Sequence, residues 1–276
     1  LAVTRLLLDL DGRGIPYIIF INKIDGTEPS VKETFDALQG LTERPLVLRE
    51  IPLREDDQIT GYVDLVSERA YAYKAGQPSD LIEIPESESN RKNEERTILL
   101  ESLADFDDEL LEQLLEDIVP GTDEVYQNLA KEMQDASIVS VFFGSAENDN
   151  GIKRLMKALR HETPEIAQTA ERLGISEGEA MAQVFKVYHG AQSGKLCMAR
   201  ILRGEFSDGT TLNGARISGI FKMLGQQQSK VSNASAGELV ALGRMDDIKA
   251  GTTLSASGNA DGPDWPGTNW RSGGAD

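Results

Sequence analysis

The apolar positions of the chain follow two patterns, and the change between them divides the sequence. In the first part, segments with apolar residues at helical spacing surround two short runs that are apolar almost throughout, 15–21 and 138–143. Such runs, rich in β-branched residues, are typical of parallel strands buried on both faces. The first part is therefore predicted to be an α/β fold built on a parallel sheet.

Helical spacing predicts several helices around these strands. Ser30 is expected to cap a helix that turns its apolar side chains inward and ends at Gly40. The other predicted helices cover residues 1–10, 94–117, 122–134 and 150–159. The long helix 94–117 is expected to place its large apolar residues on one side: Leu99, Leu100, Leu103, Phe106, Leu110, Leu111 and Leu114.

Between the two apolar runs, the composition indicates an inserted α+β subdomain. The runs 45–48, 60–66 and 70–73 are typical of strands, whereas the acidic stretch 80–90 is expected to be a loop. The strands therefore precede the long helix in this part of the chain.

The second part changes to a period of two. Short strands alternate with glycine-containing turns from 183 to 257, which predicts a small antiparallel β-barrel. Residues 258–276 are rich in Gly, Asp, Asn and Pro and are expected to be disordered, with Trp265 and Trp270 outside any core. The predicted organisation is a first domain of 1–40 and 137–164, an insertion of 41–136, a mostly helical connector of 165–182, a barrel of 183–257 and a tail of 258–276.

The chain is acidic, with a net charge of −18 over 276 residues. A broad nucleic-acid clamp needs a basic face, so we expect no sequence-specific nucleic-acid binding by the chain itself. Residues 80–135 hold 18 acidic and 4 basic residues. Two interpretations stay open for this stretch: a solvated helix face, or a docking face for a basic partner. On one continuous helix, four carboxylates would line a single stripe: Glu101, Asp105, Asp108 and Glu112.

The single cysteine, Cys197, cannot form an internal disulfide, and its apolar flanks indicate a core position. A reducing, cytoplasmic setting follows, and no apolar run reaches the roughly 20 residues of a membrane span. His161 and His189 have no companion ligands or bases, so we expect no metal site and no catalytic residue in this chain. Leu1 opens inside an apolar-periodic segment, which suggests a piece of something longer.

The most specific motif is the tetrapeptide Asn22-Lys23-Ile24-Asp25, directly after the first apolar run. Ligands bind at the carboxyl ends of strands in open α/β sheets. There, the Asp25 carboxylate can accept two parallel hydrogen bonds from the ring N–H and the amine of guanine. Adenine has no such pair of donors, so a site of this kind discriminates strongly. Asn22 can bond the other edge of the base and tie loops together, and the stem of Lys23 can lie along the base.

A second loop, Gly144-Ser145-Ala146, follows the second apolar run. Its backbone N–H groups can meet the carbonyl oxygen of guanine, and Ser145 can orient Asp25. The candidate guanine site therefore consists of Asn22, Lys23, Asp25, Ser145 and Ala146.

Two segments resemble phosphate or magnesium loops but fail on spacing or context. The segment 190–196 is one residue short of a phosphate loop, ends with Leu196 in place of a hydroxyl, and lies between predicted strands. The segment 9–12, Asp-Leu-Asp-Gly, lies too close to Asn22 and follows a helical pattern. Both are expected to be turns.

Taken together, these motifs resemble those of bacterial elongation factor G, and more closely of the divergent elongation-factor-G-like proteins. The residues 20–25 look like its guanine-specificity motif, and 144–146 look like its second guanine loop. The long gap between them resembles the inserted subdomain of that family, in which 61–66 has a similar segment. The segments 194–204 and 208–209 resemble the following barrel.

The resemblance implies part of a P-loop GTPase sheet that keeps its guanine-reading loops. The parent would bind GTP or GDP, with Mg²⁺ held by residues outside this chain, and hydrolyse GTP on the ribosome. Its insertion would meet the ribosomal stalk protein, and this chain alone is expected to be inactive. Alternatives are a non-enzymatic ribosome-docking module with a vestigial nucleotide site, or a related release or ribosome-protection GTPase.

Overall fold

The computed structural model describes residues 2–26, 30–56, 58–74, 76–190, 194–225, 227–260 and 262. The chain divides into two compact units, Leu1–Thr163 and Pro164–Asp276, and each is described here by itself. The expected tail 258–276, with both tryptophans, lies outside the described residues apart from 258–260 and 262.

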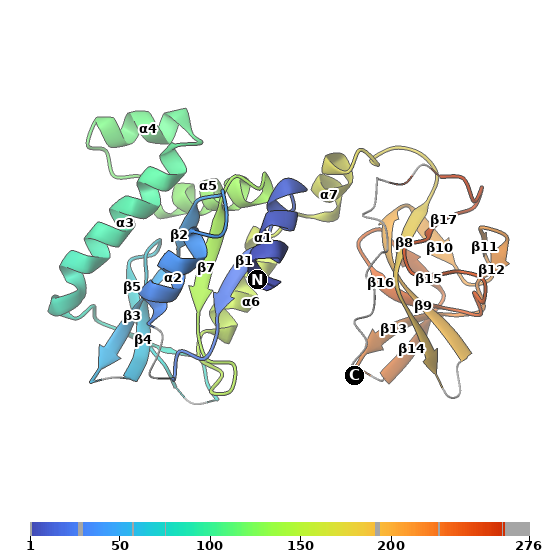
Figure 1. The fold of residues 1–276 in the computed structure, drawn as a ribbon, viewed down its shortest axis with the longest axis horizontal. Coiled ribbons are helices and arrows are strands. Elements are labelled where there is room, and N and C mark those ends of the chain that lie inside the picture. Colours follow the sequence, from blue (N-terminus) through green and yellow to red (C-terminus); the bar gives the residue numbers. More distant parts are fainter. Residues whose placement is uncertain are drawn as a thin grey trace. The chain divides into compact units, whose positions relative to one another are not determined.

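A three-stranded parallel sheet forms the centre of the first unit (Figure 1). Its strand order is β1-β7-β2, with every residue of the middle strand β7 buried, as the apolar run predicted. The three strands are β1 (Ile18–Ile21), β7 (Val139–Phe143) and β2 (Leu46–Leu48). Three helices belong to this part: α1 (Ala2–Gly12), α2 (Val31–Gln39) and α6 (Ile152–Glu162). The parallel α/β sheet predicted from the two apolar runs is therefore confirmed.

The start of α2 carries the cap expected from the sequence. The Ser30 hydroxyl accepts a hydrogen bond from the Glu33 amide at 3.2 Å, and the Glu33 carboxylate accepts one from the Ser30 amide at 2.9 Å. This reciprocal pair is a capping box, which satisfies two N–H groups that a helix start leaves without partners. Val31 is buried directly after the cap.

The segment 9–12, expected to be a turn, instead lies in the last turns of α1. The Asp11 carboxylate accepts hydrogen bonds from the Tyr17 hydroxyl at 2.9 Å and the Thr42 hydroxyl at 2.5 Å. It also pairs with Arg44 at 3.2 Å. The acidic residue therefore fastens α1 to the segment before β2.

A four-stranded antiparallel sheet, in the order β3-β4-β5-β6, forms the strand part of the insertion. The strands are β3 (Glu50–Glu55), β4 (Gln58–Asp64), β5 (Arg69–Ala72) and β6 (Asp80–Ile82). The loop expected over 80–90 is wrong in part, because it holds β6 and the 3-10 helix η1 (Glu86–Glu88). All three residues of β6 are exposed, so backbone pairing with β5 holds the strand without any apolar pattern.

The single helix expected over 94–117 is wrong, because the structure has two helices here. They are α3 (Ser89–Ala104) and α4 (Asp108–Leu115). Asp107 caps α4 by accepting the amides of Glu109 and Leu110, each at 3.1 Å. Phe106 and Leu111, expected on the buried side, are 40% and 43% exposed. The helix α5 (Thr122–Gln134) has the bounds that the sequence predicted.

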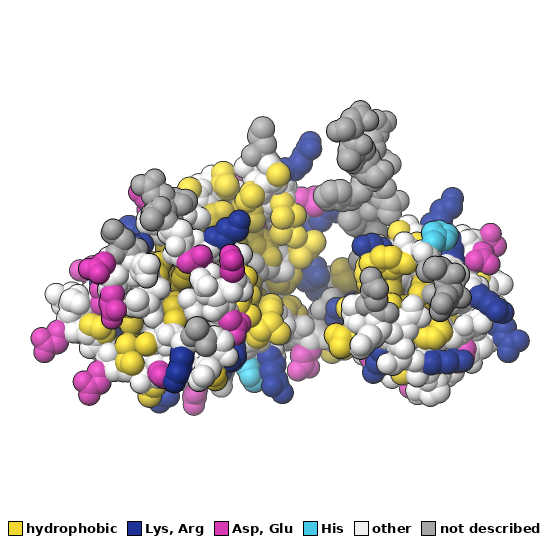
Figure 2. Space-filling view, turned by 90° about the horizontal axis from the view of Figure 1, so that it is seen from below, with side chains coloured by type: hydrophobic (Ala, Val, Ile, Leu, Met, Phe, Trp, Pro, Cys, Tyr) yellow, Lys and Arg dark blue, Asp and Glu magenta, His cyan; other side chains and the backbone are white. Residues whose placement is uncertain are grey.

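The break also corrects the acidic stripe. Glu101 belongs to α3 and Asp105 is its C-cap residue, whereas Asp108 and Glu112 belong to α4. All four side chains are exposed, but they do not share one helix. Acidic and apolar side chains both reach the surface on the face of the first unit drawn in Figure 2.

A network of buried ions lies where the insertion meets the parallel sheet. Arg49, fully buried after β2, bonds both carboxylate oxygens of Glu162 on α6, at 2.5 and 3.2 Å, and the Ser140 hydroxyl at 3.1 Å. Arg154, also on α6, pairs with Asp64 at the end of β4 at 2.9 Å. The pairing is needed because an isolated charge is very costly away from water.

The second unit is rich in β-structure. A six-stranded antiparallel sheet has the order β14-β13-β16-β9-β8-β17, and two short two-stranded sheets accompany it. Cys197 on β9 is buried in its core, as its apolar flanks predicted. The large sheet contains β8 (Met181–Gly190), β9 (Gly194–Arg203), β13 (Ile220–Leu224), β14 (Gln227–Val231), β16 (Leu239–Gly243) and β17 (Thr253–Ser255). The small sheets pair β10 (Glu205–Ser207) with β15 (Asn233–Ser235) and β11 (Thr211–Leu212) with β12 (Ala215–Arg216). The segment expected to be a mostly helical connector holds one short helix, α7 (Ile166–Arg172).

Candidate functional site

Two loops meet at the carboxyl edge of the parallel sheet, one after β1 and one after β7. Ile21 and Phe143 are register partners at the strand ends. Beyond them, the Gly144 amide donates to the Ile21 carbonyl at 2.9 Å, and the Ile24 amide donates to the Gly144 carbonyl at 3.3 Å. The loops 22–25 and 144–146, far apart in the sequence, are thus held side by side by backbone bonds.

Asn22 ties the two loops together through its side chain. Its Oδ1 accepts a hydrogen bond from the Ala146 amide at 2.9 Å. The Ser145 amide donates to the Asn150 carbonyl at 3.0 Å, in a small antiparallel bridge. Both loop amides therefore have acceptors within the chain. A base that uses the Ala146 amide has to displace the Asn22 oxygen first.

Asp25 stands exposed beside the second loop. A hydrogen bond from the Ser145 side chain holds the pKa of Asp25 below its usual range, so this carboxylate is ionised at neutral pH. Ser145 itself is only 1% exposed, and its hydroxyl also accepts a hydrogen bond from the Asn148 amide group at 3.2 Å. The buried hydroxyl thus lies between the exposed Asp25 carboxylate and Asn148.

The backbone of both loops is tightly bent. Lys23 has a positive φ of 66°, and its carbonyl accepts the Gly26 amide at 3.1 Å. Its side chain is exposed beside Asp25. A Cβ on Gly144 would lie 2.2 Å from the Asn150 carbonyl oxygen, so the strand end can approach the loop only with glycine there.

Sequence reasoning overlooked the second half of the loop after β7. Asn148 donates to Ser145, Asn150 forms the bridge with Ser145, and Gly151, at a φ of 76°, is the N-cap residue of α6. The signal was present, because the run Asn-Asp-Asn-Gly over 148–151 is typical of a tight turn.

The segment 190–196 that resembles a phosphate loop joins two strands. Gly190 and Gly194 are register partners at the ends of β8 and β9, and residues 191–193 lie outside the described residues. The Lys195 ammonium donates to the Asp246 carbonyl, and β9 follows in place of a helix. The flanking geometry is that of a hairpin.

The composition had also left two features to locate in the structure, the two histidines and any membrane-spanning helix. His161 and His189 are exposed, and among the described residues no three His, Cys, Asp or Glu side chains gather as a metal site would require. None of the helices in the described ranges combines the length and apolar character needed to cross a bilayer.

A parallel α/β unit with paired loops at its carboxyl edge, an α+β insertion and a following β-rich unit form an architecture that known proteins share. The family model for elongation factor G domain 2 matches residues 179–257. An "Elongation factor G-like protein" from Synechocystis sp. (strain ATCC 27184 / PCC 6803 / Kazusa) is 38% identical over 260 residues, which is 93% of this chain and 39% of that protein. A crystal structure from Thermus thermophilus has the same fold, with a TM-score of 0.79 and 22% identity over 94% of this chain and 38% of that one.

These matches identify the chain as a segment of the elongation-factor-G-like family of translational GTPases. It spans about two fifths of the length of the curated relative that it matches.

Proposed function

We propose that this chain supplies the guanine-reading part of a translational GTPase whose complete form binds GTP and hydrolyses it on the ribosome. The observation that carries the proposal is the pair of loops at the carboxyl edge, joined through the Asn22–Ala146 hydrogen bond. The pair presents an exposed, ionised Asp25 that Ser145 orients.

The chemistry of Asp25 selects the base. Its two oxygens can accept the ring N–H and the exocyclic amine of guanine, and charge-assisted hydrogen bonds contribute about 1.5–3 kcal/mol each. Adenine has a ring acceptor where guanine has the ring N–H, so it would leave the carboxylate poorly paired. Lys23 offers its alkyl stem to the base.

Asn22 has two roles in this proposal. Before the base binds, its Oδ1 bonds the Ala146 amide at 2.9 Å. When the base binds, the side chain rotates toward the purine edge and leaves that amide to the guanine carbonyl oxygen. The exchange replaces one hydrogen bond by another, so its net free-energy change is small.

The remaining parts of the reaction are assigned elsewhere in the parent. Phosphate cradling, Mg²⁺ binding and water positioning are separate functions in phosphoryl transfer. The two segments of this chain that resemble phosphate or magnesium loops lie in a hairpin and in α1. We therefore infer that GTP or GDP and its Mg²⁺ are held by residues outside this chain, and that the chain alone hydrolyses no GTP.

The partners follow from the family. The complete protein acts on the ribosome in the cytoplasm, and the acidic face carrying Glu101, Asp105, Asp108 and Glu112 docks a basic surface such as that of the stalk protein. The exposure of all four carboxylates on α3, α4 and their junction supports this part of the proposal.

A nucleotide titration of the complete protein tests the base-reading site. The Asp25→Asn variant gains one donor and loses one acceptor, so it should favour xanthine, which carries an oxygen where guanine has the amine. We expect fluorescent guanine nucleotide to bind at least about a hundredfold more weakly. Asp36→Asn, on the exposed side of α2, is the matched control and should bind as the parent does.

Equal guanine affinity in the Asp25→Asn variant and the parent would contradict the assignment. The inactivity of the segment has its own test, because saturable GTP hydrolysis by the purified chain would refute it.

A further inference from the structure

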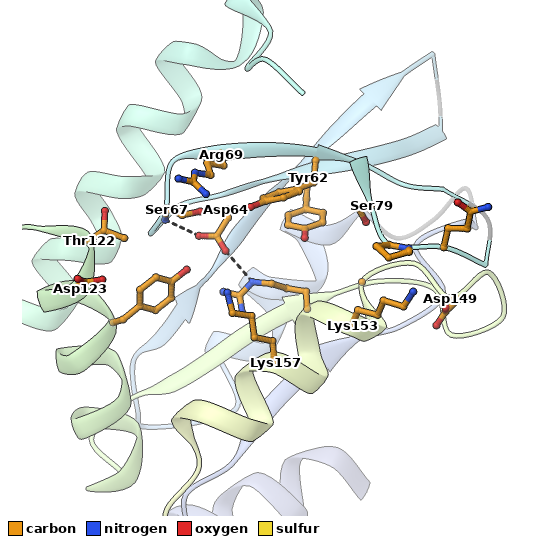
Figure 3. Close-up of a pocket in the computed structure, with 16 residues that line it drawn as sticks. Tyr62, Asp64, Ser67, Arg69, Ser79, Thr122, Asp123, Asp149, Lys153 and Lys157 are labelled. Carbon is orange, nitrogen blue, oxygen red and sulfur yellow. Dashed lines mark hydrogen bonds and ion pairs between the residues drawn. The ribbon is translucent and has the colours of Figure 1, made fainter. Parts of the chain in front are cut away.

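An open cavity of roughly 590 Å³ lies in the first unit, between the antiparallel sheet of the insertion and the helices α5 and α6 (Figure 3). None of the five candidate guanine-site residues lines it. Its lining residues come from β4, β5 and the turn between them, the segment before β6, the first turns of α5, the end of the loop after β7 and α6. Three separate parts of the unit therefore contribute to one concave surface.

Cationic side chains line this cavity on two of its walls. Arg69 comes from β5, and Lys153 and Lys157 come one turn apart from α6 (Figure 3). All three are exposed, and none forms an ion pair among the described residues. In a chain with a net charge of −18, three cations that line one cavity and form no ion pair in the described residues indicate a site for an anion.

Arg154 adds a buried charge to the same wall. Its side chain is 7% exposed and pairs with Asp64 at 2.9 Å, which neutralises that carboxylate within the cavity. Asp64 also accepts the amides of Val66 and Ser67, at 3.0 and 2.9 Å. The second terminal nitrogen of Arg154, Nη2, is buried without a hydrogen-bond partner in the described part of the chain. The guanidinium is thus incompletely paired next to the cavity.

The start of α5 supplies neutral donors. Thr122 and Asp123, in the first turn of this 13-residue helix, line the cavity. The N-cap residue is Gly121, which has no side-chain oxygen to accept from the first-turn amides. Free amides and the positive end of a helix dipole favour an oxyanion. Ser67 and Ser79 also line the cavity with hydroxyl side chains (Figure 3).

Two carboxylates oppose an anion, those of Asp123 and Asp149. Both are exposed at the cavity, whereas Asp64 is already paired. Four cationic side chains face three carboxylates in the whole lining, so the balance stays positive.

The remaining wall is aromatic. The rings of Tyr62 and Tyr71 stack with their centroids 5.1 Å apart, and both line the cavity beside Tyr126. Such a wall suits the carbon body of a ligand, while Arg69, Lys153 and Lys157 suit its charge. We propose that this cavity binds a small molecule that carries a phosphate-type oxyanion, at a site that contains none of the five candidate guanine-site residues.

Titration of the ¹⁵N-labelled chain with inorganic pyrophosphate tests the proposal. Backbone amide signals of Thr122 and Asp123 should shift in a saturable way at concentrations below about 10 mM. Lys157→Ala and Arg69→Ala, which remove charges from opposite walls, should each weaken binding by about fivefold or more. Both side chains are exposed and without ion pairs in the described residues, so the variants should keep the circular-dichroism spectrum of the parent.

Arg160→Ala is the matched control, because Arg160 is an exposed cation on the same helix that does not line this cavity. It should change the affinity by less than about twofold. The proposal is overturned if the two amide signals do not saturate, or if Arg160→Ala weakens binding as much as Lys157→Ala does. A failure here would leave the guanine-reading assignment intact, since the two sites share no residue.

Discussion

The buried pair of Arg49 and Glu162 offers a sharp test of how the insertion is joined to the parallel sheet. The Arg49 side chain is 0% exposed and that of Glu162 is 5% exposed. Two guanidinium nitrogens reach the two carboxylate oxygens, at 2.5 and 3.2 Å. The change Glu162→Gln keeps the shape of the side chain but removes its charge, so the buried cation loses its closest counter-charge.

The expected loss of stability in Glu162→Gln depends on the groups that still contact Arg49. Breaking a buried ion pair by removing one partner costs about 3–5 kcal/mol. Arg49 keeps the Ser140 hydroxyl at 3.1 Å and lies over the ring of Phe142, 5.2 Å from its centroid. The variant also keeps one carbonyl acceptor. We therefore expect a loss near the lower limit, about 3 kcal/mol in the free energy of unfolding.

Urea unfolding followed by circular dichroism at 222 nm measures this loss. In the described residues, six of the seven α-helices belong to the first unit, so the signal reports mainly on that unit. With a slope of about 2 kcal/mol per molar urea, a loss of about 3 kcal/mol lowers the midpoint by about 1.5 M. Glu43→Gln, at an exposed position before β2, is the control and should leave the midpoint unchanged within about 0.2 M.

A midpoint for Glu162→Gln that matches Glu43→Gln, at an unchanged slope, would refute the reasoning. A second variant separates the loss of charge from the loss of shape. Replacing both partners, as Arg49→Met with Glu162→Leu, removes the unpaired charge and should recover most of the stability. A double variant less stable than Glu162→Gln alone would show that packing, and not charge, is the main contribution.

Three further predictions concern single positions. Ser30→Ala removes the hydroxyl that accepts the Glu33 amide and should cost about 1 kcal/mol, measured as a lower melting temperature. Gly144→Ala brings a Cβ to 2.2 Å from the Asn150 carbonyl oxygen, so we expect a loss above about 2 kcal/mol and weaker guanine binding by the complete protein. Burial raises the pKa of Glu50 to about 7 from 4.5, so its contribution to stability is fully present below pH 4.5 and is lost as the pH rises through about 7. Glu50→Gln should therefore be more stable than the parent at pH 8, by roughly 2–3 kcal/mol, and should show a flatter pH profile of the unfolding midpoint between pH 5 and 8.

The sequence was sufficient to predict that the loops after β1 and β7 lie at one edge of the sheet. The runs before Asn22 and before Gly144 are short, apolar and β-branched, and this pattern has few structural solutions other than a parallel strand with both faces covered. Parallel strands bring their carboxyl ends to the same edge, so the loops meet as they do at Ile24 and Gly144. The inference needed no knowledge of the segment between them.

The break between α3 and α4 could not be predicted from the same kind of pattern. Leu103 and Leu110 are both fully buried and lie seven residues apart, a spacing that one continuous helix also satisfies. The two helices are separated by the cap at Asp107, whose carboxylate competes with the helix for nearby amides. In a run of acidic residues such a cap looks like any other exposed carboxylate.

The sequence pattern also did not predict the buried charged residues, yet they connect the insertion to the candidate site. Glu50 begins β3, and its Oε1 accepts a hydrogen bond from the Phe143 amide at 3.1 Å. Phe143 directly precedes Gly144, so this carboxyl group holds the end of β7 from the side opposite to the loop after β1. The charge of Arg154 lowers the pKa of Glu50 and that of Asp64 raises it, and these two residues pair with each other. Residues of α6 and β4 therefore lie close to the same carboxyl group. The insertion therefore does more than extend the surface of the unit, because its first strand supports the backbone from which the loop after β7 departs.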